Sequence, residues 1–87
     1  MIRIVYGVRF LKCVKAIPVA QRRKLAKLLE TFSDDPYHPT LHTKKLSGKL
    51  FGFLSFRISR DWRIMFQFID AETIQLVDAA HRKDVYR

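Results

Sequence analysis

The sequence has one cysteine, few acidic residues and no long apolar run. Cys13 has no second cysteine to pair with, and no Cys/His grouping has the spacing of a structural zinc site. The longest apolar runs are far shorter than the ~20 residues of a membrane-spanning helix, and the N-terminus lacks the long apolar segment of a signal peptide. We therefore expect a cytoplasmic protein without a transmembrane segment.

Acidic residues are outnumbered by basic ones. The chain has 8 Asp and Glu against 17 Lys and Arg, a formal net charge of +9, yet 48% of its 87 residues are hydrophobic. This hydrophobic share excludes a disordered basic tail, and a chain of this length buries enough surface for one domain only. Because so many positive charges repel one another in a compact domain, we expect a polyanionic partner, either a nucleic acid or an acidic protein.

Helical spacing is present only in the N-terminal third. Phe10, Val14 and Ile17 recur on one side of a short helix, which Pro18 ends. Proline also suits the first turn of a following helix, whose apolar residues extend to Phe32. The sequence predicts strands at 2–6, 50–58, 62–69 and 73–80, helices at 8–16 and 18–32, and a loop at 33–48. This order, β-α-α-β-β-β, predicts an α+β fold, an antiparallel sheet with two N-terminal helices packed on one face.

Alternation along the last three strands divides their side chains between two faces. Even-numbered residues are mostly apolar and should pack under the helices, whereas odd-numbered ones, Arg57 and Arg63 among them, should face the other side. The three-residue connection 59–61 places Arg57 opposite Arg63, a repulsive pair that a bound phosphate would neutralise. Pairing Phe68 with Ile74 would further place Arg63 opposite Ala79 and diagonal to His81.

Two arginines and a histidine on one face are the residue types that RNA cleavage by side chains requires. Arginine holds phosphate oxygens bidentately, and histidine can carry a proton near neutral pH. Each of these residues, taken alone, is more often simply solvated. His38 and His42 lie beside prolines in the long loop, and we do not favour either as catalytic.

The arrangement resembles the RelE/ParE superfamily of bacterial toxins over nearly its full length. The resembling segments are Arg9-Phe10-Leu11-Lys12, Asp35-Pro36, Lys45-Leu46-Ser47-Gly48, Phe56-Arg57-Ile58, Asp61-Trp62-Arg63-Ile64-Met65-Phe66, His81 and Val85-Tyr86-Arg87. The resemblance implies a single toxin domain over residues 1–87, with no cofactor and no metal. It also implies a ribosome-dependent endoribonuclease that cuts mRNA in the decoding site and is held inactive by an acidic antitoxin.

The resemblance also implies roles for individual residues. Arg63 would hold the scissile phosphate, His81 would transfer a proton, Tyr86 would act in catalysis or base stacking, and Asp61 would contribute to the site, as in the YafQ-like branch. The residues expected to bind RNA are Arg57, Lys44, Lys45, Lys49 and Arg82.

The sequence departs from the family pattern in two places. Leu54 and Phe56 stand where RelE proper carries lysines, and only Lys44 or Lys45 stands where other branches have an acid or base before the Leu-x-Gly motif. The general base is therefore open among His81, Asp61 and a lysine. Two other functions fit the same fold and charge, namely a ParE-like gyrase inhibitor that performs no cleavage and a non-catalytic basic RNA-binding module.

Overall fold

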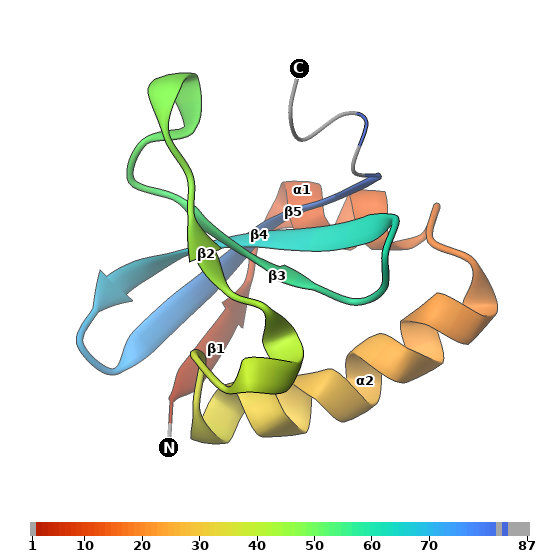
Figure 1. Cartoon of the computed structure of the whole chain (residues 1–87), viewed down its shortest axis with the longest axis horizontal. Helices are drawn as coiled ribbons and strands as arrows, with labels where there is room; N and C mark the ends of the chain where they lie inside the picture. Colours follow the sequence, from red (N-terminus) through yellow and green to blue (C-terminus); the bar gives the residue numbers. More distant parts are fainter. Residues whose placement is uncertain (1, 82, 84–87) are drawn as a thin grey trace.

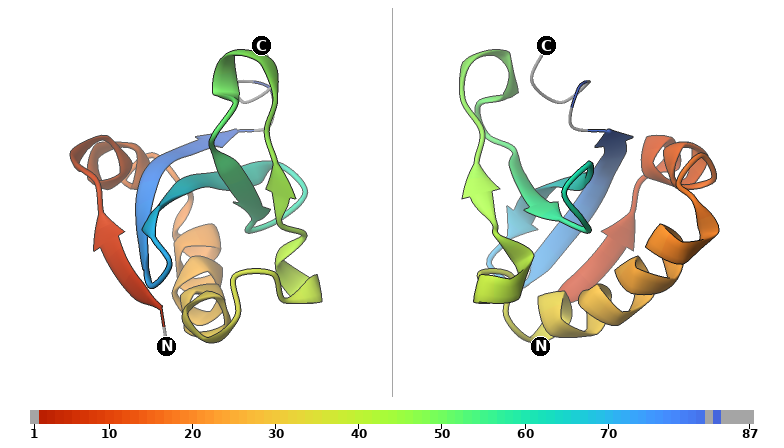
Figure 2. Two further views of the ribbon diagram at one scale, coloured as in Figure 1. Left: turned by 90° about the vertical axis from the view of Figure 1, so that its left-hand side faces the viewer. Right: turned by 45° about the vertical axis from the view of Figure 1, so that its right-hand side comes forward.

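A five-stranded sheet forms the centre of the computed structural model, which describes residues 2–81 and 83 (Figure 1). The elements in chain order are β1 (Arg3–Tyr6), α1 (Val8–Val14), α2 (Val19–Asp34), the 3-10 turn η1 (Pro39–Leu41), β2 (Lys44–Lys45), the 3-10 turn η2 (Gly48–Leu50), β3 (Leu54–Arg57), β4 (Trp62–Asp70) and β5 (Thr73–His81). The sheet is curved, and α2 runs along one of its faces (Figure 2). No helix in the described part of the chain is long and apolar enough to cross a membrane.

The strand order is β1-β5-β4-β3-β2, in which β1 is parallel to β5 and all other neighbours are antiparallel. This confirms the predicted α+β class and the β-α-α-β-β-β order. The fifth strand, β2, lies in the segment expected to be a loop, and its Lys44 and Lys45 pair with Ser55 and Leu54 of β3. A strand of two residues is too short to show alternation, so the sequence pattern could not reveal it.

The strand predicted at 50–58 is shorter in the structure, because its first residues turn. Gly48 and Gly52 adopt φ angles of 63° and 98°, a region that favours glycine. They close a compact hairpin tip between β2 and β3.

The core lies between α2 and the sheet. Phe32 of α2 is fully buried and packs against Phe56 and Phe66, with ring centroids 4.7 and 4.9 Å apart. Even-numbered residues of β3 and β4 face this core, as alternation predicts. The helix begins at Val19, with Pro18 as its N-cap rather than in its first turn, and continues to Asp34, two residues further than predicted.

One feature of β5 overturns part of the expected register. Phe68 does pair with Ile74, but the ladder shifts at Val77, an extra residue between the Phe66–Leu76 and Met65–Asp78 pairs. The predicted Arg63–Ala79 pair is therefore wrong: Arg63 pairs with Ala80, and His81 pairs with Trp62. Because an extra residue moves all later side chains to the opposite face, His81 faces the same side as Trp62 and the opposite side from Arg63.

Candidate active site

Arg57 and Arg63 face each other across β3 and β4, on the side of the sheet away from α2. Arg57 is exposed, whereas Arg63 is only 8% exposed, and its guanidinium donates to the carbonyl oxygen of Ser59 at 3.5 Å. The predicted arginine pair is thus confirmed. Because Ser59 lies in the β3–β4 turn, this hydrogen bond orients the Arg63 guanidinium.

A narrow recess lies beside this pair. It is lined by His42, Lys44, Ser55, Phe56, Arg57 and Arg63, and we call it the arginine recess. Its volume of about 20 Å³ is enough for one water-sized group, such as one oxygen of a phosphate. Because basic side chains from three segments converge on so small a space, the recess is suited to an anion.

His42 is the residue that the sequence-based reasoning missed. It ends η1 in a left-handed conformation with φ 51°, uncommon for a residue other than glycine, and its exposed side chain lines the arginine recess. Such backbone strain concentrates at functional sites. The neighbouring His38 instead has a local structural role, since its Nδ1 accepts from the backbone N–H of Thr40 at 3.2 Å.

A second and larger recess, of about 590 Å³, contains His81, and we call it the β5 recess. It is lined by Arg9, Cys13, Ala16, Lys49, Leu50, Trp62, Met65, Asp78, Ala79, Ala80 and His81. The His81 ring lies edge-on to Trp62 with centroids 5.4 Å apart, and its Nδ1 accepts from the backbone N–H of Lys83 at 3.3 Å. The two recesses adjoin, because Ser55 of the first pairs directly with Met65 of the second.

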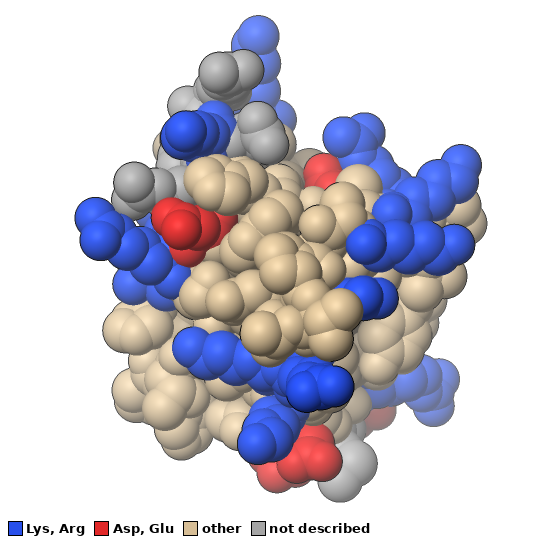
Figure 3. Space-filling view, turned by 90° about the vertical axis from the view of Figure 1, so that its right-hand side faces the viewer, with Lys and Arg blue, Asp and Glu red and all other residues tan. Residues whose placement is uncertain are grey.

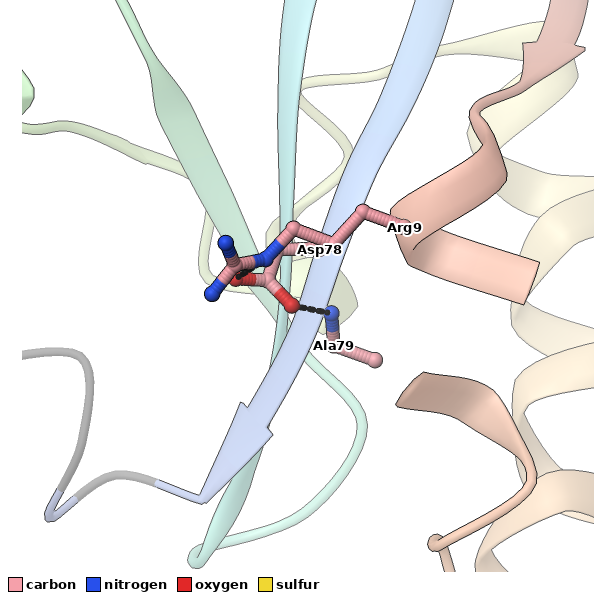
Figure 4. Close-up of polar contacts among 3 residues, drawn as sticks. All are labelled: Arg9, Asp78 and Ala79. Carbon is pink, nitrogen blue, oxygen red and sulfur yellow. Dashed lines mark hydrogen bonds and ion pairs between the residues drawn. The ribbon is translucent and has the colours of Figure 1, made fainter. Parts of the chain in front are cut away.

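One wall of the β5 recess is an ion pair between α1 and β5 (Figure 4). Arg9 Nε contacts Asp78 Oδ2 at 3.1 Å, and Asp78 Oδ1 accepts from the backbone N–H of Ala79 at 2.8 Å. Asp78 also hydrogen-bonds the Cys13 thiol, which together with burial raises the pKa of Cys13. Asp78 therefore joins α1 to the end of β5 that β1 leaves uncovered.

The remaining predicted site residues are dispersed. Asp61 is exposed in the β3–β4 turn, Lys49 lines the β5 recess, and Lys45 lies beside a separate aromatic cavity. Arg82 and Tyr86 lie outside the described residues. Within residues 2–81 and 83, no three His, Cys, Asp or Glu side chains come together as metal ligands would.

Positive charge also extends beyond the recesses. Figure 3 views the side of the molecule on which α2 begins, and basic side chains surround an uncharged central area with few acidic ones between them. This distribution suits a large polyanionic partner better than a single small anion.

Comparison with solved structures identifies the fold. The chain is similar to YafQ from E. coli strain BL21(DE3), with 18% identity, full coverage of both chains and a TM-score of 0.76. It is also similar to a chain of the RelB–RelE antitoxin–toxin complex from Methanococcus jannaschii, with 22% identity, 94% coverage of each chain and a TM-score of 0.75. A metal-bound toxin from Helicobacter pylori matches with 21% identity, 98% and 99% coverage and a TM-score of 0.75.

At these identities the likeness establishes a shared three-dimensional arrangement over nearly the whole chain. No family model and no curated protein sequence matches this chain. The fold is therefore the one that these solved structures share.

Proposed function

We propose that this chain, which has the fold of the RelE/ParE-type toxins, is the toxin of a type II toxin–antitoxin system and cleaves ribosome-bound mRNA. One observation carries the proposal: Arg57, Arg63 and His42 line a single recess on the face of the sheet away from α2. An anion-binding arginine pair beside an imidazole supplies phosphate binding and one proton carrier for phosphodiester cleavage. A gyrase inhibitor that performs no chemistry requires no such grouping.

The proposed reaction is attack of a ribose 2′-oxygen on the adjacent phosphorus. The new oxygen–phosphorus bond forms as the bond to the 5′-oxygen breaks, so the products end in a 2′,3′-cyclic phosphate and a 5′-hydroxyl. Arg57 and Arg63 hold the phosphate oxygens and stabilise the extra negative charge of the transition state. Arg63, held by Ser59, stays in place, whereas the exposed Arg57 closes on the substrate.

Two proton transfers complete the reaction: a base takes the 2′-OH proton, and an acid protonates the departing 5′-oxygen. His42 is our first choice for a proton carrier at the phosphate, because it lines the arginine recess itself. His81 lies in the adjoining β5 recess, where it pairs with Trp62 and faces the opposite side of the sheet from Arg63, and it is our second choice. Asp61 and Tyr86 remain predicted to contribute to the catalytic site.

The partners follow from the charge. A ribosome offers ribosomal RNA to the basic surface and presents mRNA as a single strand, and Arg57, Lys44, Lys45, Lys49 and Arg82 are proposed to bind RNA. The inhibitor is proposed to be an acidic antitoxin protein. An acidic chain would cover the same basic surface and so exclude RNA.

Primer extension on a defined mRNA tests the proposal. The message is incubated in a purified translation system with and without the protein, next to a lane that lacks ribosomes. We expect cuts at decoding-site positions only when ribosomes and protein are both present. Intact message in every lane contradicts the proposal and favours a gyrase inhibitor, and cuts without ribosomes would instead identify a free-standing ribonuclease.

A further inference from the structure

A third cavity, of about 410 Å³, lies on the other side of the β2–β3 ribbon and shares no residue with the two recesses. It is lined by Tyr37, Lys45, Leu46, Phe51, Gly52, Phe53, Leu54 and Phe68. Four of these side chains are aromatic. Neither the proposed chemistry nor the fold accounts for so many rings around one open cavity.

Gly52 lines the cavity without contributing a side chain. It lies in the hairpin tip, with a φ angle of 98°, just before the pairing of β3 with β4 begins at Leu54 and Phe66. A Cβ atom at Gly52 would meet nothing within 4 Å, so the cavity is open at this point, and Phe68 is half-buried. Tyr37 stacks nearly parallel to that ring, with centroids 6.5 Å apart and planes at 16°. Tyr37 and Phe68 therefore line the cavity with two nearly parallel rings.

Two of the rings are directed to solvent. Phe51 is 84% exposed and Tyr37 is 54% exposed. Large exposed rings grouped around a cavity mark a binding site rather than a core. Planar aromatic surfaces of this kind stack unpaired bases.

The position of β2 indicates how one RNA strand could reach both the arginine recess and the aromatic cavity. Lys44 lines the arginine recess on one side of this edge strand, and the next residue, Lys45, lines the aromatic cavity on the other. Both lysines are exposed. An RNA strand that crosses the edge at these two cations places a phosphate beside Arg57 and Arg63 and a neighbouring base in the cavity.

We propose that the aromatic cavity binds an unpaired nucleobase of the RNA strand whose phosphate occupies the arginine recess. The inference rests on the proposed function, which supplies the RNA. An acidic protein segment would also meet Lys45, but it would not account for the four aromatic rings or for the position of Lys44 and Lys45 between the cavity and the arginine recess.

Binding of a short single-stranded RNA tests the assignment without cleavage. The probe has about ten nucleotides, is 2′-O-methylated throughout so that no 2′-oxygen can attack, and carries one 2-aminopurine. Tyr37→Ala and Phe51→Ala are compared with wild type by anisotropy and by quenching of the 2-aminopurine. The matched control is Tyr6→Ala, which removes a 48% exposed ring from β1, at the opposite edge of the sheet.

Each cavity variant is expected to weaken binding about 5- to 100-fold and to lose the quenching, whereas Tyr6→Ala keeps both. The dependence of affinity on salt should stay as in wild type, because no charge is removed. Unchanged affinity and quenching in both cavity variants overturn the assignment, as they would if the cavity served a protein. If wild type cuts ribosome-bound mRNA while this result is obtained, only the cavity assignment fails and the proposed function stands.

Discussion

Arg57 and Arg63 pair directly across β3 and β4, so that two guanidiniums share one position of the ladder. Like charges directly opposite each other destabilise a sheet by a few tenths to about 1 kcal/mol. A bound anion would offset this repulsion by contacting both guanidiniums. The pair is therefore the structural basis of the proposed phosphate site.

The repulsion can be measured in the absence of RNA. Arg57→Gln is expected to raise the free energy of unfolding by roughly 0.2–1 kcal/mol, because it removes one charge from an exposed position and no buried contact. Inorganic phosphate should stabilise wild type against heat and have little effect on this variant. Thermal melts at a series of phosphate concentrations test both effects, and equal stabilisation of the two proteins would contradict an anion site at this pair.

His42 is expected to act in the reaction rather than in folding. His42→Asn suits the left-handed backbone at this position, since asparagine adopts that conformation more readily than most residues, and it removes the imidazole. We expect single-turnover cleavage of ribosome-bound mRNA to fall about 10²- to 10⁴-fold, with the melting temperature nearly unchanged. His38→Asn is the matched control and should retain cleavage, because the His38 side chain hydrogen-bonds Thr40 of its own loop and does not line the arginine recess. Equal losses in the two variants would argue against a proton carrier at His42.

Asp78 is expected to suppress the reactivity of Cys13. The hydrogen bond from the thiol to Asp78, with burial, raises the pKa of Cys13, so less thiolate is present at a given pH. Asp78→Asn should therefore lower that pKa and speed alkylation by iodoacetamide at pH 8. A profile of alkylation rate against pH from 7 to 10 should show its midpoint moving to lower pH in the variant. A midpoint that stays in place would show that Asp78 does not control the thiol.

Two glycines are expected to differ in how much stability the same substitution costs. A Cβ at Gly7 would lie 2.8 Å from the backbone oxygen of Leu76, so Gly7→Asn should cost about 1–3 kcal/mol of stability. Gly48 has a positive φ but open space around it, and asparagine tolerates that conformation. Gly48→Asn should therefore cost much less. Urea denaturation compares the two, and equal losses would contradict the packing of β1 and α1 against β5.

The sequence predicted the face that carries the arginines but not the position of the histidine. A three-residue turn and strict alternation were enough to place Arg57 opposite Arg63. The extra residue Val77 moves every later side chain of β5 to the opposite face of the sheet. A prediction from strict alternation cannot anticipate such an inserted residue. The sequence indicates this shift only through Asp78, a charged residue at an even position where alternation predicts an apolar side chain.

His42 was beyond sequence reasoning for a different reason. Its place beside the arginines depends on β2 pairing with β3, on η1, and on a left-handed backbone angle that no residue pattern encodes. The core, in contrast, was predictable, because Phe32, Phe56 and Phe66 follow the helical and strand periods. Periodicity determines which side chains are buried, whereas short irregular segments determine which polar groups meet.

The central claim is that the arginine recess performs the cleavage of ribosome-bound mRNA. Its most direct test is the single-turnover cleavage rate of Arg57→Gln against that of Arg60→Gln, each of which removes one exposed arginine from the same hairpin. We predict a loss of about 10²- to 10³-fold for Arg57→Gln and a change of only a few-fold for Arg60→Gln, because only Arg57 lines the arginine recess. Equal rates for the two variants would contradict the claim. They would show that Arg57 contributes only as one of the many positive charges of the protein.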